Sequence, residues 1–469
     1  MGSIASEGKP HAVCIPFPAQ GHINAMLKMA KVLYSKGFHI TFIHTESNYN
    51  RVIDSADRSS LCGLANFRFE KIPADIQINH PPIHGPLWAP TRSLLNKLNE
   101  PTSDMPLPTC IVSDSFMSFT LELAAELGVP NIFLCPVSAC SFMGFLYYKE
   151  LMARDIVPLK SESDLTNGYL ETVIDWIPGM KNIRLRDLPS YIRTTDPNDI
   201  LLNFCKDEAQ AALRATAIIM HTFDDLERTV LDALSPILPP VYPIGPLDLL
   251  CSQILDVKIK SIWSSLWKED STCMDWLQGV RAPGSVIYVN FGSGVHLTSQ
   301  QLTEFAWGIA NSGHNFLWVI RPDMVEGGSV VLPAEFLAET STRGLVTSWC
   351  LQEEVLRHPS VGGFLTHCGW NSTMEAISAG VPVICWPVFA DQPTNSRYLC
   401  KEWGKGLEID GNVERDEVAK QIGELLEGDE GKEVRKNALK WKESAVRATE
   451  LGGKSSLHLE RLIKEVMFR

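Results

Sequence analysis

The sequence offers little support for disulfide bonds or for a bound metal. Its 12 cysteines are scattered over 469 residues, with no Cys-x-x-Cys pair and no spacing typical of a disulfide framework. A chain of this length builds a core without covalent staples, so we expect reduced thiols and a cytoplasmic protein. The sequence also lacks an HExxH motif and any cluster of cysteine and histidine. We therefore expect no metal and no metal cofactor.

Positive charge is in short supply as well. The chain has 42 lysines and arginines against 55 aspartates and glutamates, which gives a net charge of −13. Nucleic acid carries a dense negative charge, so we do not expect it as a partner. Hydrophobic residues make up 45% and charged residues 21% of the chain, which is typical of a globular protein.

No apolar run is long enough to cross a bilayer. The most apolar region, residues 131–148, is interrupted by Pro136. The first ten residues, MGSIASEGKP, lack the apolar centre of a secretory signal. They fit the short myristoylation pattern through Gly2 and Ser6, which we interpret as a chance match. We expect no stable membrane insertion.

The order of apolar runs predicts α/β domains. Residues 11–18 form an apolar run, a helical pattern then ends at Gly37, and a second apolar run covers 38–45. This β-α-β unit is typical of a doubly wound parallel sheet. The stretch 66–101 shows no clear period and predicts long loops.

The length of the chain favours two such domains. The segment 238–250 is dense in proline and looks too irregular for a packed element, so it marks the junction. The predicted organisation is a first domain at 1–240, a linker at 241–253 and a second domain at 254–453.

His22 and Asp114 are the candidate proton-transfer pair. His22 lies in the turn that opens the first helix, where the helix dipole disfavours imidazolium and keeps the ring neutral. Asp114 ends the apolar run 110–114, so in a parallel sheet it faces the same edge as the first turn. A lone histidine at a helix start is more often structural. A carboxylate beside it favours a base and its orienting partner instead.

The segment 349–392 carries most of the remaining chemistry. It reads WCLQEEVLRHPSVGGFLTHCGWNSTMEAISAGVPVICWPVFADQ. We interpret it as a buried strand at 361–367, a tight turn, a helix at 372–379 with Asn371 as its N-cap, and a second strand at 381–387. The first turn of such a helix is a ready site for phosphate.

Several side chains of this segment have the chemistry to bind a nucleotide-linked sugar. His367, Asn371 and Ser372 suit a diphosphate, and Glu375 accepts hydrogen bonds from ribose hydroxyls. Trp349 offers a flat face for a base. Asp391 and Gln392 suit the hydroxyls of a sugar. Taken singly, core packing, capping or a surface turn explains most of them, but their joint order and spacing favour the ligand site.

Two further stretches bear on the site. The run 284–294 ends in a Gly-x-Gly turn without the third glycine of the dinucleotide fingerprint. Gly292 and Ser293 still allow backbone N–H groups to approach a phosphate. The aromatic side chains of Phe116, Phe142 and Phe145 suit an apolar acceptor pocket, with core packing as the alternative for each.

The segment 349–392 resembles the donor-binding signature of plant family 1 UDP-glycosyltransferases, enzymes of the GT-B fold. The match includes WC-x-Q, THCGWNS, a glutamate four residues after the asparagine, GVP, WP and DQ. The segment PAQGHIN around Gly21 and His22 is similar to the catalytic-histidine segment of the family, and VSD to its aspartate. The sequence departs from the family at Leu351 and Ala25, where proline is common.

The resemblance implies a role for each matching position. In the donor site it implies that Trp349 stacks on uracil next to Cys350, that Gln352 and Glu375 lie at the ribose, and that the backbone of Trp370 lies against the sugar. It further implies that His367, Asn371 and Ser372 bind the phosphates, and that Asp391 and Gln392 bind the hexose. It also places Ser138 near the transferred sugar. His22 and Asp114 become the catalytic pair.

The function implied by the resemblance is inverting transfer of glucose from UDP-glucose, without a metal. The acceptor is a hydroxyl or carboxyl group of a small lipophilic plant metabolite, such as a terpenoid, phenolic or cyanohydrin. The resemblance further implies two Rossmann-like domains that face a cleft, a helix at 454–469 that packs back on the first domain, and a monomer. Two alternatives stay open: a nicotinamide-dependent oxidoreductase and a non-catalytic small-molecule binder.

Overall fold

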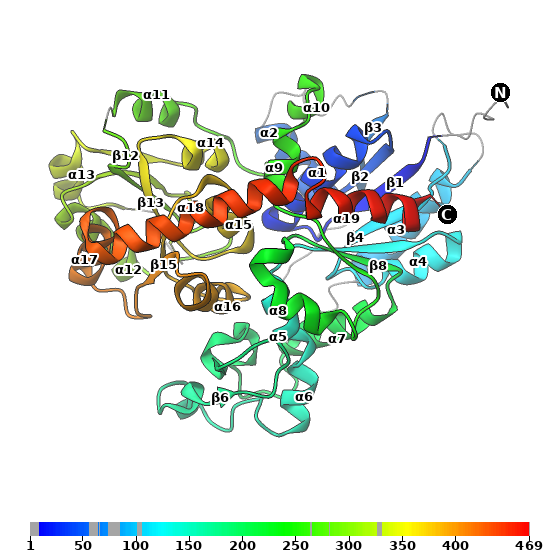
Figure 1. Cartoon of the computed structure of the whole chain (residues 1–469), viewed down its shortest axis with the longest axis horizontal. Helices are drawn as coiled ribbons and strands as arrows, with labels where there is room; N and C mark the ends of the chain where they lie inside the picture. The colour runs from blue at the N-terminus through cyan, green and yellow to red at the C-terminus, as the bar shows by residue number, and fades with distance from the viewer. Residues whose placement is uncertain are drawn as a thin grey trace.

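The computed structural model describes residues 9–55, 64, 66–73, 85–100, 106–262, 265–280, 282–325 and 331–468. Within them the chain forms two α/β halves, with the first half in blue to green on the right of Figure 1 and the second in yellow to orange on the left. Each half contains a parallel sheet with helices on both faces. These are the two Rossmann-like domains that the sequence predicts.

The first sheet has the strand order β3-β2-β1-β4-β5-β8-β9 and is parallel throughout. Its strands are β1 His11–Ile15, β2 His39–Thr45, β3 Phe67–Ile72, β4 Cys110–Asp114, β5 Asn131–Cys135, β8 Ala217–Met220 and β9 Val241–Pro243. The helices of this half are α1 Gln20–Ser35, α2 Glu46–Ser55, α3 Gly85–Leu98, α4 Thr120–Leu127, α5 Ala139–Leu146, α6 Tyr148–Ala153, α7 Ile200–Ala211, α8 Asp224–Leu234, α9 Leu247–Ser252 and α10 Val257–Lys260.

The second sheet is also parallel, in the order β12-β11-β10-β13-β14-β15. Its strands are β10 Val286–Asn290, β11 Asn315–Val319, β12 Gly344–Thr347, β13 Val361–Thr366, β14 Val383–Cys385 and β15 Gly406–Glu408. The helices are α11 Thr272–Gly279, α12 Ser299–Asn311, α13 Ala334–Thr340, α14 Gln352–Arg357, α15 Trp370–Ala379, α16 Gln392–Arg397, α17 Arg415–Glu427 and α18 Asp429–Thr449.

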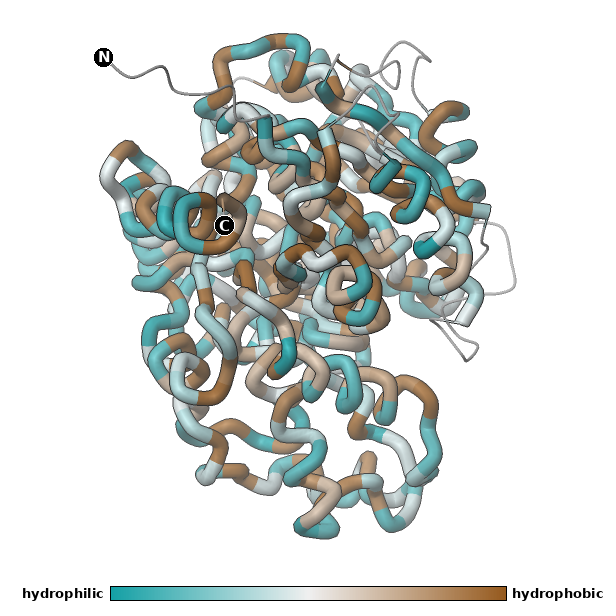
Figure 2. The backbone as a smooth tube through the Cα atoms, turned by 90° about the vertical axis from the view of Figure 1, so that its right-hand side faces the viewer, coloured by the Kyte–Doolittle hydropathy of each residue, from teal (hydrophilic) through white to brown (hydrophobic). Residues whose placement is uncertain are grey.

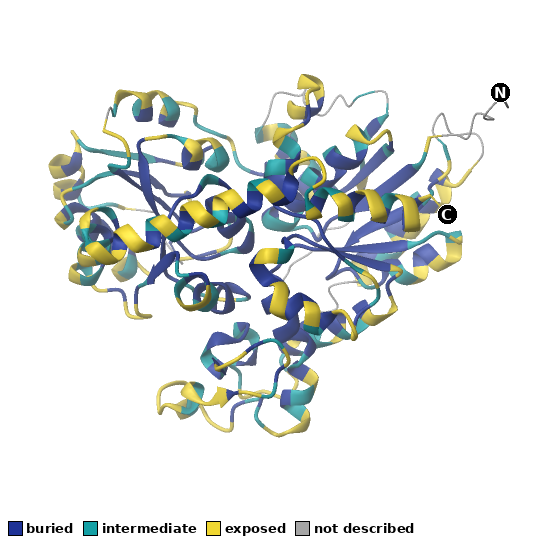
Figure 3. Cartoon of the chain, viewed as in Figure 1, coloured by how far each residue is buried: buried dark blue, intermediate teal, exposed yellow. Residues whose placement is uncertain are grey.

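The central strands of the first sheet are buried on both faces. All residues of β1, β4 and β5 are buried, as expected for central strands covered by helices on two sides. Alternate residues of β1 point to opposite faces of the sheet. Val13 and Ile15 pack in the apolar cluster on one face, and Ala12 and Cys14 pack in the cluster on the other. Figure 3 shows the strands in dark blue between helices whose outer faces are yellow.

The strand register fixes where the loops meet. Ile15 at the end of β1 pairs with Ser113 near the end of β4, so the turns after these two strands are neighbours. In the second sheet Asn290 of β10 pairs with Thr366 of β13, and Thr366 pairs with Cys385 of β14. Functional residues that follow these strands therefore collect at the carboxyl edge of each sheet.

The C-terminal helices return to the first half. In Figure 1, α18 runs along the second domain and α19 (Lys454–Leu462) lies against the first. Leu459, Leu462 and Met467 are buried in the same core as Ala12 and Cys14. The helix that ends at the C label carries both brown and teal residues in Figure 2, as an amphipathic helix should.

Two expectations from the sequence are wrong. The stretch 66–101 is not only loop, because it holds β3 and α3; residues 74–84 between them lie outside the described part. The proline-dense segment 238–250 is packed, because it contains β9 and most of α9. Strand β9 is an edge strand and pairs with β8 on one side only. A proline such as Pro243 is tolerated there, because its missing N–H can face away from the sheet.

Two absences can be stated for the described residues. None of their helices combines the length and apolar character that a membrane span requires. They also contain no group of three or more histidine, cysteine, aspartate or glutamate side chains arranged to hold a metal ion.

Candidate active site

His22 and Asp114 form a close pair between the first turn of α1 and the end of β4. Nδ1 of His22 lies 2.7 Å from Oδ2 of Asp114, and Oδ1 of Asp114 accepts a 2.9 Å hydrogen bond from the amide of Phe116. The carboxylate is 1% exposed while the imidazole is 24% exposed. The histidine is therefore held from behind by a buried carboxylate and keeps access to a substrate.

The electrostatics of His22 differ from the sequence expectation. Burial lowers its pKa, but the charge and hydrogen bond of Asp114 and the charge of Asp391 together raise the pKa above its ordinary value. The helix N-terminus alone would keep the ring neutral. In the structure, the two carboxylates outweigh burial, and they make His22 a stronger proton acceptor.

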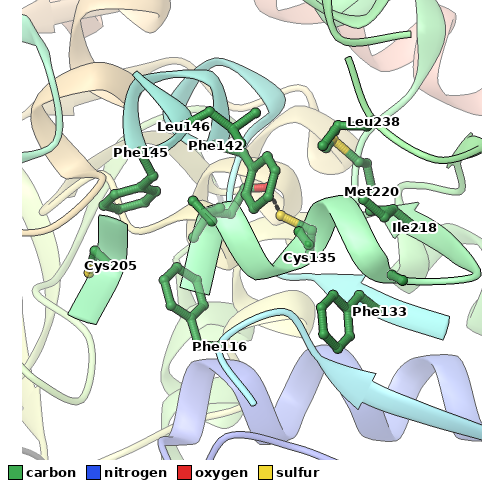
Figure 4. Packing of buried hydrophobic residues seen from close by; sticks show 14 of the residues in the cluster. Phe116, Phe133, Cys135, Phe142, Phe145, Leu146, Cys205, Ile218, Met220 and Leu238 are labelled. Atoms are coloured by element: carbon green, nitrogen blue, oxygen red, sulfur yellow. Dashed lines mark hydrogen bonds between the residues drawn. The ribbon is translucent and has the colours of Figure 1, made fainter. Parts of the chain in front are cut away.

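Aromatic side chains surround the imidazole. The ring centroids of Phe17 and Phe116 lie 5.1 and 5.9 Å from that of His22. Phe116 in turn contacts Phe145 with a centroid distance of 5.7 Å. Phe142 is 1% exposed and belongs to the same apolar cluster (Figure 4). The apolar wall next to His22 thus comes from Phe17 and Phe116, whereas Phe142 supports it from the core.

Helix α15 begins two residues earlier than the sequence indicates. Gly369 is its N-cap in an extended conformation, so Asn371 lies inside the first turn and is not the cap. The side chain of Asn371 instead donates a 2.6 Å hydrogen bond to the carbonyl of Gly21 on α1. The expected helix end is present, and the side chain of Asn371 also connects it to the segment that carries His22.

Glycine makes room for the ring of His367 at the end of β13. A Cβ on Gly292 would lie 2.5 Å from Cε1 and Nε2 of this ring, and one on Gly369 would lie 2.5 Å from Nε2. Burial and the charge of Arg321 lower the pKa of His367 to about 4. A neutral imidazole is a hydrogen-bond donor without charge at neutral pH. Half-buried Ser293 follows Gly292 in the same turn.

The polar residues of α14 and α15 form one network. Gln352 donates 2.8 Å hydrogen bonds to the hydroxyl of Ser372 and to Oε2 of Glu375. Oε1 of Glu375 accepts a 2.8 Å bond from Lys28, which also pairs with Glu353 at 2.6 Å. Lys28 comes from α1 of the first domain, and no motif in the sequence marks it.

Trp349, the predicted base-binding residue, and its neighbour Cys350 have different surroundings. Trp349 is half-buried and stacks on Trp267, with centroids 5.9 Å apart and an interplanar angle of 28°. Cys350 is buried, and its sulfur lies 3.3 Å from the hydroxyl of Tyr288 in the core of the second domain. Trp267 is missing from the sequence-based set because it lies well outside the signature segment.

Asp391 and Gln392 sit where α16 begins. Burial raises the pKa of Asp391 to about 6, although a hydrogen bond from Asn395 and the charge of His22 act in the opposite direction. Oε1 of Gln392 accepts hydrogen bonds of 2.9 and 3.1 Å from the amides of Val388 and Phe389. Asp391 and His22 each affect the pKa of the other, which indicates that they lie close together. The predicted catalytic pair and the predicted sugar-binding residues are therefore neighbours.

Other predicted residues take part in contacts between the domains. Ser138, the N-cap of α5, donates a 2.8 Å hydrogen bond to Asn395 of α16. The indole of Trp370 donates a 2.7 Å bond to the carbonyl of His221, which follows β8. The predicted acceptor half and donor half are therefore joined by side chains of the candidate site itself.

Comparison with known proteins agrees with this arrangement. The family described as "Glycosyltransferase, N-terminal domain" matches residues 11–173, and "UDP-glucoronosyl and UDP-glucosyl transferase" matches residues 263–441. A 7-deoxyloganetin glucosyltransferase of Gardenia jasminoides is 52% identical, with all of both chains covered. An (R)-mandelonitrile beta-glucosyltransferase of Prunus dulcis is 51% identical over 100% of this chain and 99% of its own.

A solved structure supplies the fold class. Phytolacca americana UGT2, complexed with UDP-2fluoro-glucose and pterostilbene, superposes with a TM-score of 0.78 at 29% identity, covering 98% of this chain and 99% of its own. The fold is GT-B, that of a glycosyltransferase with two Rossmann-like domains. The chain belongs to the plant family 1 UDP-glycosyltransferases. It is an enzyme, and its co-substrate is a UDP-sugar.

Proposed function

We propose that this enzyme transfers glucose from UDP-glucose to a hydroxyl group of a small lipophilic plant metabolite, with inversion at the anomeric carbon. A carboxyl acceptor follows the same chemistry. The observation that carries the proposal is the 2.7 Å contact between His22 and Asp114, next to Asp391 of the donor segment. A proton acceptor from the first domain and a sugar-binding carboxylate from the second thus face one reaction centre.

The reaction is a single displacement. Nε2 of His22 takes the proton of the acceptor hydroxyl while its oxygen attacks C1 of the sugar, and Asp114 stabilises the imidazolium that forms. The bond between C1 and the UDP oxygen breaks on the opposite side. The N-terminus of α15 and the neutral ring of His367 stabilise the diphosphate that leaves.

The donor roles follow the contacts of the second domain. Gln352, Ser372 and Glu375 meet in one hydrogen-bonded network, which suits the two hydroxyls of a ribose. Trp349 offers a half-buried ring to uracil. We assign the hexose hydroxyls to Asp391 and Gln392.

The acceptor class is supported by the surroundings of His22. Phe17 and Phe116 border the imidazole, so an apolar molecule with one polar group fits better than a charged one. The relatives named for 7-deoxyloganetin, an iridoid terpenoid, and for (R)-mandelonitrile, a cyanohydrin, support the same class. We propose terpenoid alcohols and cyanohydrins as the first candidates, with phenolics next.

The working form of the enzyme is a monomer in the cytoplasm that binds no nucleic acid. Its net charge of −13 supports the last point. The 11 described cysteines are all free, which suits a reducing compartment. We keep the division at 1–240, 241–253 and 254–453 as a proposal, in which β9, α9 and α10 at the junction pack on the first domain.

A panel of donors and acceptors read by mass spectrometry tests the function. UDP-glucose with a terpenoid alcohol or cyanohydrin should give a product heavier by one hexose, and NMR should show a β-glucoside. Turnover of a nicotinamide cofactor in the absence of any glycoside would contradict the proposal. So would binding of UDP-glucose without product from any member of the panel.

A further inference from the structure

The side-chain amide of Asn395 connects the carboxylate of Asp391 to the first domain. Its Nδ2 donates hydrogen bonds of 2.8 Å to Oδ2 of Asp391 and 2.9 Å to the carbonyl of Cys368. Its Oδ1 accepts bonds of 2.8 Å from the hydroxyl of Ser138 and 3.2 Å from that of Ser141. The residue is 1% exposed.

The four partners fix the orientation of this amide. A carboxylate and a carbonyl only accept hydrogen bonds, so the NH₂ group must face them, and the two hydroxyls must then donate to the oxygen. The reverse orientation would press the amide oxygen against two acceptors in a buried place. Asn395 is therefore not interchangeable with aspartate at this position.

The partners belong to parts of the protein that a transferase has to align. Ser138 and Ser141 open α5 of the first domain, and Cys368 lies directly before the glycine that caps α15. Asp391 is the residue to which we assign the sugar hydroxyls. The side chain of Asn395 thus contacts three parts of the protein. These are the carboxylate of Asp391, the loop before α15 and the first domain.

We propose that Asn395 is a positioning residue for glycosyl transfer, which aims the carboxylate of Asp391 at the hexose. This inference rests on the proposed sugar role of Asp391. Nothing in the signature segment 349–392 marks Asn395, since it lies three residues beyond its end. Its action is indirect, because it reaches the sugar only through the carboxylate that it holds.

Electrostatics agree with the geometry. Burial raises the pKa of Asp391, and the hydrogen bond from Asn395 opposes this effect. The other titratable groups that interact with Asp391 are His22 of α1 and Tyr191 of the short helix Ser190–Ile192. Of these, His22 also lowers the pKa of Asp391, whereas Asn395 does so without titrating.

The test compares Asn395→Asp with Asn437→Asp, an amide that donates a 3.1 Å bond to the carbonyl of Gly404 away from the site. Loss of a hydrogen bond to a charged group corresponds to roughly a 10- to 100-fold effect, and we expect KM for UDP-glucose to rise by that factor in Asn395→Asp. The acid limb of kcat/KM for UDP-glucose should move to higher pH.

Two controls accompany this test. Affinity for UDP, which has no hexose, should stay within threefold in Asn395→Asp when measured by calorimetry. Asn437→Asp should match the wild type in kinetics and in UDP affinity.

Further variants separate the possible failures. Unchanged donor kinetics in Asp391→Ala would overturn the proposed sugar role, and the inference with it. A damaged Asp391→Ala with an unaffected Asn395→Asp would overturn the Asn395 assignment alone. Adding Asn395→Asp to Asp391→Ala should cause no further loss, and an additive loss would count against action through Asp391. If Asn395→Asp fails to fold, Asn395→Ser is measured in the same way, and a parallel fall in UDP affinity there would assign a structural role and overturn the inference.

Discussion

Nδ1 of His22 and Oδ2 of Asp114 lie 2.7 Å apart although 92 positions separate the two residues in the chain. The parallel pairing of β1 and β4 causes this contact, because it brings the turns after both strands to one edge of the sheet. The contact raises the pKa of His22, which we propose as the base, and leaves its other ring nitrogen for an acceptor hydroxyl.

Replacement of His22 by alanine should remove the general base. Such a base typically contributes a factor of 10²–10⁴, so kcat should fall by roughly that range. Affinity for UDP should not change, because the donor groups belong to the second domain. Steady-state kinetics with UDP detection measures the effect.

The matched control is His458→Ala. His458 forms a similar pair with Asp224 at 3.1 Å, far from the donor segment in sequence. Full activity is expected there. Turnover near the wild-type level in His22→Ala would contradict the mechanism.

Replacement of Asp114 by asparagine should change the pH profile as well as the rate. The carboxylate raises the pKa of His22, so its removal lowers that pKa. The base is active when neutral, and the acid limb of kcat/KM should therefore shift to lower pH while the plateau drops. A profile with an unmoved acid limb would show that Asp114 does not tune His22.

Replacement of Asp391 by asparagine should stabilise the ligand-free protein at high pH. The pKa of Asp391 is about 6 in the folded chain against 3.8 in the ordinary case, so the folded state loses stability as pH rises through this interval. About two pKa units correspond to at most about 3 kcal/mol of unfolding free energy.

Urea unfolding at pH 8 and at pH 4 measures this gain. The variant should be more stable at pH 8, and the difference should shrink toward pH 4. Asp410→Asn, at an exposed position, controls for the loss of one negative charge. Equal stability of Asp391→Asn and wild type at pH 8 would mean that burial of this carboxylate carries no cost.

Replacement of Gly292 by alanine should damage the phosphate site. Gly292 has a φ of +69°, and the new Cβ would lie 2.5 Å from the ring of His367. Gly37 is the control, since its φ is +95° but no atom lies within 4 Å of an added Cβ. Both variants carry the backbone strain, so their difference isolates the clash, which we expect to cost about 1–3 kcal/mol.

Unfolding measurements give this difference, and UDP titration shows whether the ring of His367 has moved. UDP affinity should fall in Gly292→Ala and remain unchanged in Gly37→Ala. Equal behaviour of the two variants would rule out the predicted contact with His367.

The sequence predicts what depends on local pattern. Buried apolar runs with helical segments between them predict both sheets, and the turn after β13 predicts a helix end suited to phosphate. The family resemblance supplies the fold class. The contact of His22 with Asp114 follows from parallel strand pairing, which a β-α-β pattern already implies.

The remaining features depend on how the domains dock. The contacts of Lys28 with Glu375 and of Ser138 with Asn395 join the two domains. They cannot be predicted from residue spacing, because they depend on how the domains pack against each other. Part of the rise in the pKa of His22 has the same origin, because the charge of Asp391 from the other domain adds to the larger effect of Asp114. Strand β9 escapes prediction because an edge position tolerates proline.

The return of the C-terminal helix to the first sheet has a consequence for biosynthesis. Leu459, Leu462 and Met467 complete a core to which the first strand, through Ala12 and Cys14, also belongs. During synthesis, part of the apolar core of the first domain therefore stays uncovered until residues 454–467 have emerged from the ribosome. A nascent chain stalled before residue 454 should depend on chaperones that a full-length chain no longer needs.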